Sequence, residues 1–172
     1  MQRTGYGGTT NMQPCKGERI CRMSQSLSQV YIHLIFSTKH RVPLLTPDIY
    51  EGLREYMGGT LRTLESPSLV LGVASDHVHV LFCLSRKMAL TNVIEEIKRS
   101  SSKWIKTQGS QFADMYWQAG YGAFSVSASR LDAVKRYILN QEEHHRRVSF
   151  QDEFRKFLKE YKVDYDERYV WD

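Results

Sequence analysis

The sequence predicts an α+β fold: a four-stranded antiparallel sheet with two helices packed on one face. Three observations support this class: four short segments have strand-like apolar patterns, longer segments between them have helical spacing, and no internal repeat is visible. The predicted order is βαββαβ followed by an additional C-terminal helix that carries a tyrosine, the ferredoxin-like or RRM-like arrangement. It leaves the second face of the sheet for a ligand or for a further helix.

The first strand and the first helix are predicted within residues 29–64. Apolar side chains recur with a period of two in QVYIHLIFSTK, which starts at Gln29 and predicts a strand. Pro43 and Pro47 then break the chain. From there to about Leu64, apolar residues recur at helical spacing and predict an amphipathic helix.

The middle of the chain predicts a pair of strands followed by a second helix. The apolar runs LVLGVA, residues 69–74, and HVHVLFCL, residues 77–84, flank a short turn at Ser75 and Asp76. Residues 89–107 then place apolar side chains at helical spacing. These elements supply the ββα part of the predicted order.

The last strand and the remaining helices are predicted after Trp117. Two glycines in WQAGYGAFSVS permit a tight turn, and residues 123–126 then predict a short strand. Residues 130–148 predict a third helix with a buried apolar stripe, and residues 151–161 predict a short amphipathic helix.

We expect three regions along the chain. Residues 1–23 show neither a helical nor a strand period and predict a flexible N-terminal leader. Residues 24–148 contain the predicted sheet and its helices and form the main domain. Residues 149–172 form a C-terminal helix and tail.

Composition and charge narrow the classes of partner. No apolar stretch is long enough to cross a membrane, and three cysteines without a zinc-type spacing favour free thiols, so we expect a cytoplasmic protein without a membrane partner. The formal net charge is +5, and residues 86–106 hold six cations against two acids. This local basic element either binds a polyanionic partner or forms a solvated helix face.

Two histidines, His77 and His79, lie within the second strand of the predicted pair. Because successive side chains alternate between faces, both imidazoles share one face, about 6.5–7 Å apart along the backbone. Val78 and Val80 point the other way, where we expect the core. Two imidazoles on the open face can bind one divalent cation, but solvent-facing histidines without a ligand give the same pattern, so a third partner is needed.

The third helix offers such a partner in the segment YILNQ. Tyr137 and Gln141 are four residues apart and share a face, rotated by about 70° from the stripe formed by Leu131, Val134 and Ile138. We therefore expect both at the rim of the buried side. A half-buried core tyrosine and a surface glutamine fit the same spacing.

Several motifs in the same order resemble one known family. DHVH at residues 76–79 resembles the His-hydrophobic-His motif of HUH nucleases, and the YxxxQ spacing from Tyr137 to Gln141 resembles the tyrosine helix of single-tyrosine insertion-sequence transposases. The resemblance covers about residues 28–148 and includes HLIFSTKHR, KRSSSKWIK and WQAGYGAFSVS. The related REP-associated tyrosine transposases usually carry Asn-Pro after the tyrosine motif, whereas this chain has Asn140 followed by glutamine, which favours the mobile-element branch.

The resemblance implies a transposase that cleaves and rejoins single-stranded DNA at the ends of an insertion sequence through a 5′-phosphotyrosine intermediate. It assigns Tyr137 as the nucleophile. The implied ligands of Mg²⁺ or Mn²⁺ are His77, His79 and Gln141. Terminal DNA hairpins are the implied substrate, and a homodimer with active sites shared between subunits is the implied assembly. The alternative is a domesticated or non-catalytic single-stranded nucleic-acid-binding protein.

Basic residues are candidates for contacts with DNA phosphates. They follow the first strand, lie on the second helix or precede the tyrosine: Lys39, Arg41, Lys98, Arg99, Lys103 and Arg136. Trp104 either stacks on a base or fills core space, and its apolar spacing favours the core. Asp76 is expected to orient a turn or a histidine rather than to bind metal, and His33 is expected to be structural.

Overall fold

The computed structural model describes residues 27–141, 149–168, 170 and 171. Its elements follow the predicted order. They are β1 (Val30–Ser37), η1 (Lys39–Arg41), α1 (Pro47–Thr63), β2 (Ser68–Val73), β3 (His77–Leu84), α2 (Leu90–Lys106), η2 (Ser110–Phe112), β4 (Gly122–Val126), η3 (Ala128–Arg130), α3 (Leu131–Leu139) and α5 (Phe150–Glu160), where η marks a short 3-10 helix.

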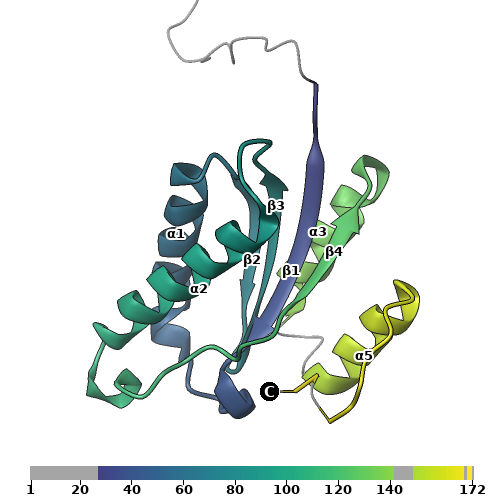
Figure 1. The fold of residues 1–172 in the computed structure, drawn as a ribbon. Helices are drawn as coiled ribbons and strands as arrows, with labels where there is room; N and C mark the ends of the chain where they lie inside the picture. The colour runs from purple at the N-terminus through teal and green to yellow at the C-terminus, as the bar shows by residue number, and fades with distance from the viewer. Residues whose placement is uncertain (1–26, 142–148, 169, 172) are drawn as a thin grey trace, which may run out of the picture.

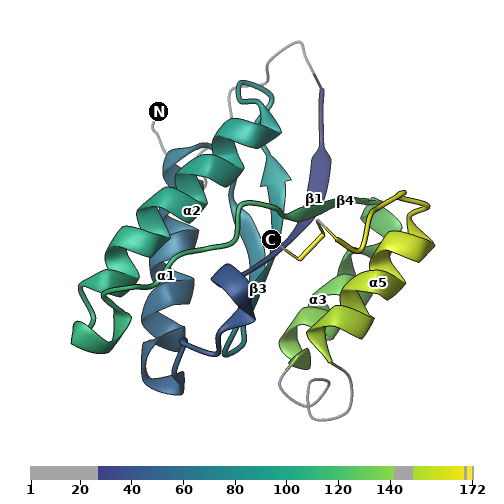
Figure 2. The ribbon, with the colours of Figure 1, turned by 60° about the horizontal axis from the view of Figure 1, so that its bottom comes forward.

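The four strands form one antiparallel sheet with the order β2-β3-β1-β4. Helices α1 and α2 pack on one face of this sheet and α3 lies on the other (Figure 1), with α5 beside α3 (Figure 2). The α+β class, the ferredoxin-like strand order and the additional tyrosine-bearing helix are thus confirmed. Of the helix predicted over residues 130–148, the structure describes the part up to Gln141.

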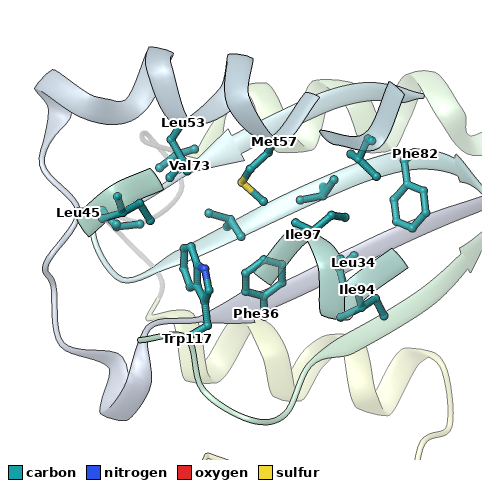
Figure 3. Packing of buried hydrophobic residues seen from close by; sticks show 14 of the residues in the cluster. Leu34, Phe36, Leu45, Leu53, Met57, Val73, Phe82, Ile94, Ile97 and Trp117 are labelled. Carbon is teal, nitrogen blue, oxygen red and sulfur yellow. The ribbon is translucent and has the colours of Figure 1, made fainter. Parts of the chain in front are cut away.

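The main hydrophobic core lies between the sheet and helices α1 and α2. From the sheet it takes alternate residues of β1 and β3, among them Phe36, Val78 and Val80, which are almost fully buried. Figure 3 shows Phe36 among the side chains that fill this layer. Trp104 is partly buried against the same core and stacks on Tyr56, with ring centroids 5.6 Å apart, as its spacing predicted. Burial of this apolar surface is the main force that holds the two layers together.

Two smaller apolar clusters attach α3 and α5 to the opposite face of the sheet. Ile138 of α3 is buried in one cluster with Leu81 and Val126. The other joins Ile35 and Phe124 of the sheet to three buried residues of α5: Phe150, Phe154 and Leu158. Their spacing explains the predicted amphipathic helix, and α5 folds as part of the same unit as the sheet.

Two glycines allow these helices to approach the sheet closely. A Cβ atom at Gly72 of β2 would lie 2.9 Å from Cγ2 of Ile138 and 3.1 Å from its carbonyl oxygen. A Cβ atom at Gly122 of β4 would lie 2.5 Å from the ring of Phe154. A larger residue at either position would push α3 or α5 away from the sheet, and with it the side chains that these helices place there.

We expect Gly72→Ala to lower the free energy of unfolding by about 1–3 kcal/mol, because the new methyl group overpacks the contact with Ile138. Denaturant unfolding measures this loss. Gly59→Ala is the matched control: its Cβ atom would approach Arg62 Nη2 at 3.8 Å. Alanine is favoured over glycine inside a helix by about 0.5–1 kcal/mol. Equal stability of the two variants would contradict the close approach of α3 to β2.

In the described part of the chain, no helix combines the length and the apolar character needed to cross a membrane. Cys83 is a free, half-buried thiol, as its apolar surroundings predicted. Cys15 and Cys21 lie outside the described residues.

Candidate metal centre and nucleophile

His77 and His79 of β3 share one face of the sheet, while Val78 and Val80 belong to the main core, as strand alternation predicted. Each imidazole is only 1% exposed. The expectation that the pair lies on an open face is therefore wrong. The C-terminal part of the chain covers it, and the ring of Phe150 stacks on His77 with centroids 4.4 Å apart.

Each imidazole of the pair has a neighbour that orients it. His77 donates from Nδ1 to Oδ1 of Asp76 at 2.6 Å, since a carboxylate can only accept, and this is the orienting role predicted for Asp76. Nδ1 of His79 lies 2.9 Å from Nε2 of His33. Burial lowers the pKa of His33 to about 4, so this ring is neutral at neutral pH and can accept a hydrogen bond from His79. Both contacts are made through Nδ1, so the Nε2 atoms of the pair face Gln141 and Glu153.

Gln141 and Glu153 bring oxygen atoms to these two nitrogens. Gln141, just after α3, places Oε1 3.5 Å from Nε2 of His77 and donates from its amide nitrogen to Oε1 of Glu153 at 3.0 Å. Glu153, on α5, places Oε2 3.6 Å from Nε2 of His79. Together His77, His79 and Glu153 offer ligand atoms that all lie within 4.8 Å of one another.

This donor set fits a divalent cation such as Mg²⁺ or Mn²⁺. Neighbouring ligands of an octahedral cation at about 2.1 Å lie about 3 Å apart, and separations of 3.5 and 3.6 Å are close to this value. Imidazole nitrogens suit Mn²⁺, while amide and carboxylate oxygens suit both cations. The fold therefore brings the three predicted ligands together and adds Glu153 to them.

Sequence reasoning missed Glu153 and treated His33 as structural. The available signal for Glu153 was its place in the apolar stripe of α5, between Phe150 and Phe154, where it is 3% exposed. A carboxylate is rarely fully buried unless it is paired. His33 shares a face of β1 with Ile35, but its approach to the imidazole pair depends on the pairing of β1 with β3.

Burial raises the pKa of Glu153 to about 8 from an ordinary value of 4.5, and the negative charge of Asp76 adds to the rise. Between these values the folded protein keeps a proton that the unfolded chain has lost, so rising pH favours unfolding. Buried His33 acts in the opposite sense between about pH 4 and pH 6.5, because there the unfolded chain binds a proton that the folded protein does not. Above pH 6.5 the effect of Glu153 is no longer offset by His33.

In the metal-free protein we therefore expect the free energy of unfolding to fall by about 1–2 kcal/mol between pH 6.5 and pH 8. Denaturant unfolding in the presence of a chelator measures this change. Glu153→Gln should remove the fall, because an amide does not titrate, whereas Glu160→Gln, at an exposed position of the same helix, should keep it. Identical pH profiles for Glu153→Gln and the wild type would refute the assignment to Glu153.

Tyr137, on α3, lies beside the imidazole pair of its own chain. Its ring packs edge-on against those of His79 and His33, with centroid distances of 6.0 and 6.3 Å, and against Phe157 of α5 at 5.6 Å. The side chain is half-buried and lines a cavity of about 550 Å³ between β4, α3 and α5, which Glu153 also lines. The predicted nucleophile and the predicted metal ligands thus meet within a single chain.

Three of the predicted DNA contacts belong to elements that border the site, η1 and α3. Lys39 and Arg41 belong to η1, which follows β1 at the end of the sheet where that strand pairs with His77. Lys39 is exposed, and Arg41 donates to the carbonyl oxygen of Trp171 at 3.0 Å. Arg136 is exposed on α3.

The other three, Lys98, Arg99 and Lys103, lie on α2 and are not brought to the site, because α2 packs on the opposite face of the sheet. Arg99 is exposed and forms an ion pair with Glu96. Burial lowers the pKa of Lys98 to about 8, and its ammonium donates to three backbone carbonyls, of residues 118, 119 and 120, at 2.6, 3.1 and 2.9 Å. Lys98 therefore holds the segment that leads into β4.

Comparison with known proteins shows which family has these features. A family model described as "Transposase IS200 like" matches residues 26–141, more than half of the chain. The ISDra2 transposase TnpA of Deinococcus radiodurans is 22% identical over 118 residues, which cover 66% of this chain and 84% of that relative.

Solved structures share the fold. The crystal structure of a candidate transposase from Deinococcus radiodurans R1 superimposes with a TM-score of 0.56 at 20% identity, over 70% of this chain and 96% of that one. The structure of a REP-associated tyrosine transposase bound to a REP hairpin gives a TM-score of 0.51 at 17% identity, over 72% and 74% of the two chains. The chain therefore belongs to the IS200-like transposases, the single-tyrosine family with a His-hydrophobic-His motif that its sequence resembles.

Proposed function

We propose that this transposase cleaves and rejoins single-stranded DNA at the ends of an insertion sequence through a 5′-phosphotyrosine intermediate, with the help of a divalent cation. One observation carries the proposal: the phenol ring of Tyr137 packs against His79 within a cluster of metal-binding side chains of the same chain. A nucleophile beside such a cluster suits attack on a phosphate group.

In the proposed cleavage step, the phenolic oxygen of Tyr137 loses its proton and attacks the phosphorus of the scissile phosphodiester. A bond forms between this oxygen and phosphorus, the bond to the 3′ oxygen breaks, and that oxygen takes up a proton to become a free 3′-OH. The 5′-phosphotyrosine link keeps roughly the free energy of a phosphodiester, so a second 3′-OH can reverse the step without ATP. The same side chain therefore serves both cleavage and joining.

His77, His79 and Gln141 are the residues that we propose hold Mg²⁺ or Mn²⁺. The cation, when bound, offsets the negative charge that builds up on the phosphate in the transition state. Asp76 and His33 contact the Nδ1 atoms of the two imidazoles and so orient the Nε2 atoms toward the proposed cation. Because α3 and α5 cover the rings, water is kept away from them and the electrostatic interactions of the site are strengthened.

The DNA partner that we propose is single-stranded and carries a terminal hairpin. The REP-associated transposase with a similar fold is bound to a REP hairpin, which supports this class of ligand. Lys39, Arg41 and Arg136 are the proposed phosphate contacts near the site. His40 and Arg41 have left-handed φ values of 58° and 57°, and such backbone strain in residues other than glycine is concentrated at functional sites. Three further cations lie on α2 and can contact only DNA that continues to the other face of the sheet. They are Lys98, Arg99 and Lys103.

A homodimer with shared active sites is the assembly that we propose. One tyrosine holds one DNA end at a time, so the joining of two ends needs a tyrosine from each subunit. In the described chain Tyr137 lies beside its own imidazole pair. Sharing of sites therefore requires α3 to move to the imidazole pair of the partner subunit.

A covalent-adduct assay tests the proposed function. Full-length protein, incubated with Mn²⁺ and with single-stranded DNA that carries a hairpin from the ends of the element, should give a protein–DNA adduct that survives a denaturing gel. A chelator should prevent the adduct. Binding of this DNA without an adduct would contradict the proposal and favour the non-catalytic alternative. Helices α3 and α5 cover the sheet face on which RRM-like modules stack bases, and this makes an RRM-like mode of binding less favourable.

A further inference from the structure

We infer that Glu153, contributed by the C-terminal helix α5, is a further ligand of the divalent cation in this site. The inference deepens the proposed function and rests on it for the presence of a cation. It extends the metal site beyond residues 26–141, the range that the family model matches, since α5 begins at Phe150.

The carboxylate of Glu153 lies where the two imidazoles converge. Its Oε2 is 3.6 Å from Nε2 of His79, whose other ring nitrogen contacts His33. With His77, these residues offer ligand atoms within 4.8 Å of one another. Neighbouring ligands of an octahedral cation lie about 3 Å apart, so these atoms would need to approach one another by up to roughly 2 Å to bind one cation.

Gln141 holds this carboxylate in place. Its amide nitrogen donates to Oε1 of Glu153 at 3.0 Å, which leaves Oε2 on the side of His79. Its own Oε1 lies 3.5 Å from Nε2 of His77. Because an amide has both a donor and an acceptor, Gln141 can orient the carboxylate and still offer its oxygen to the cation. The proposed ligand Gln141 and the inferred ligand Glu153 are therefore compatible.

A rigid element positions Glu153. Phe150, almost one turn before it, stacks on His77 with centroids 4.4 Å apart, and Ser149 caps the start of the helix by accepting from the backbone N–H of Asp152. At 3% exposure, a buried carboxylate costs free energy unless positive charge or hydrogen bonds compensate it. A divalent cation between the carboxylate and the imidazoles supplies positive charge at this point.

A carboxylate also changes which cations the site can hold. Two imidazoles and an amide oxygen are neutral ligands and leave the double charge of a cation uncompensated. Glu153 adds one negative charge and a hard oxygen, which Mg²⁺ and Mn²⁺ favour. The affinity for these cations should therefore depend strongly on this side chain.

Binding of Mn²⁺ alone, followed by the loss of the EPR signal of the free ion, tests the inference without DNA. Glu153→Gln should raise the Kd for Mn²⁺ at least about tenfold. Glu160→Gln removes the same charge at an exposed position of the same helix and should leave the Kd unchanged. A Kd of Glu153→Gln within roughly twofold of the wild type, or a wild type that binds no Mn²⁺, would overturn the inference.

Two further measurements separate the loss of a ligand from other causes. Glu153→Asp keeps the carboxylate, so its Kd should lie between those of the wild type and Glu153→Gln; a Kd as high as that of Glu153→Gln would count against a ligand role. Metal-free Glu153→Gln should unfold at the same denaturant concentration as the wild type or a higher one, because an amide of the same shape never carries the charge that is costly to bury. A less stable Glu153→Gln would mean that the carboxylate serves packing and not the cation.

The adduct assay distinguishes this inference from the proposed function. If Mn²⁺ binding depends on Glu153 but the wild type forms no adduct, the proposed function fails and the ligand assignment stands. If the adduct forms while Glu153→Gln binds Mn²⁺ as tightly as the wild type, only the ligand assignment fails.

Discussion

Tyr137→Phe is expected to abolish the covalent protein–DNA adduct while leaving DNA binding intact. The substitution removes the only atom of the side chain that can attack phosphorus. It keeps the aromatic ring, whose edge-on contacts with His79, His33 and Phe157 hold α3 against the sheet and α5. Adduct formation should therefore be lost completely, whereas the stability of the fold should change little.

A denaturing gel measures the adduct of Tyr137→Phe, and a gel-shift assay at the same DNA concentration measures binding. Tyr161→Phe is the matched control, because Tyr161 lines the same cavity and its hydroxyl donates to the carbonyl oxygen of Ser125 at 3.2 Å. Its adduct should form at the wild-type level. A persistent adduct in Tyr137→Phe would remove the proposed nucleophile and point to another side chain.

The elements and most of the site could be predicted because they depend on local patterns. Alternation along β3 places His77 and His79 on one face whatever the rest of the chain does, and a spacing of four residues places Tyr137 and Gln141 on one face of a helix. The order of elements along the chain then predicts that the imidazole pair and the tyrosine helix lie on the same side of the sheet. With α1 and α2 on the core side, a helix that follows β4 packs on the other face of the sheet, where the imidazoles lie.

The remaining parts of the site depend on tertiary docking and could not be predicted. The apolar spacing of α5 indicates that Glu153 lies on the buried side of this helix. It does not indicate which surface of the protein packs against that side. That surface is set by Gly122, which admits the ring of Phe154 to the sheet. Lys98 could not be assigned from the sequence for the same reason. Its charge and its position on a basic helix predict a phosphate contact. In the structure it instead binds backbone carbonyls of a segment that follows α2 and η2.

His77→Ala is expected to remove both metal binding and DNA cleavage. The substitution deletes one of the two proposed nitrogen ligands. It also deletes the N–H group that donates to Asp76 at 2.6 Å. The Kd for Mn²⁺ should rise at least about 100-fold, and adduct formation at a limiting Mn²⁺ concentration should fall by a similar factor. Loss of the ring that stacks on Phe150 also lowers the free energy of unfolding, by about 1–3 kcal/mol, so both assays require a temperature at which the variant is folded.

Two comparisons separate the loss of this ligand from a loss of structure. His40→Asn removes an exposed histidine of η1, and asparagine tolerates the left-handed φ of 58° there, so Mn²⁺ binding and the adduct should both persist. In a folded His77→Ala protein, raising Mn²⁺ about 100-fold should restore part of the adduct, because occupancy follows the ratio of concentration to Kd. An unfolded protein gains nothing from added metal. If His77→Ala instead forms the adduct at the wild-type rate in limiting Mn²⁺, cleavage does not depend on this imidazole, and the contacts of His77 with Asp76 and Gln141 must serve the fold alone.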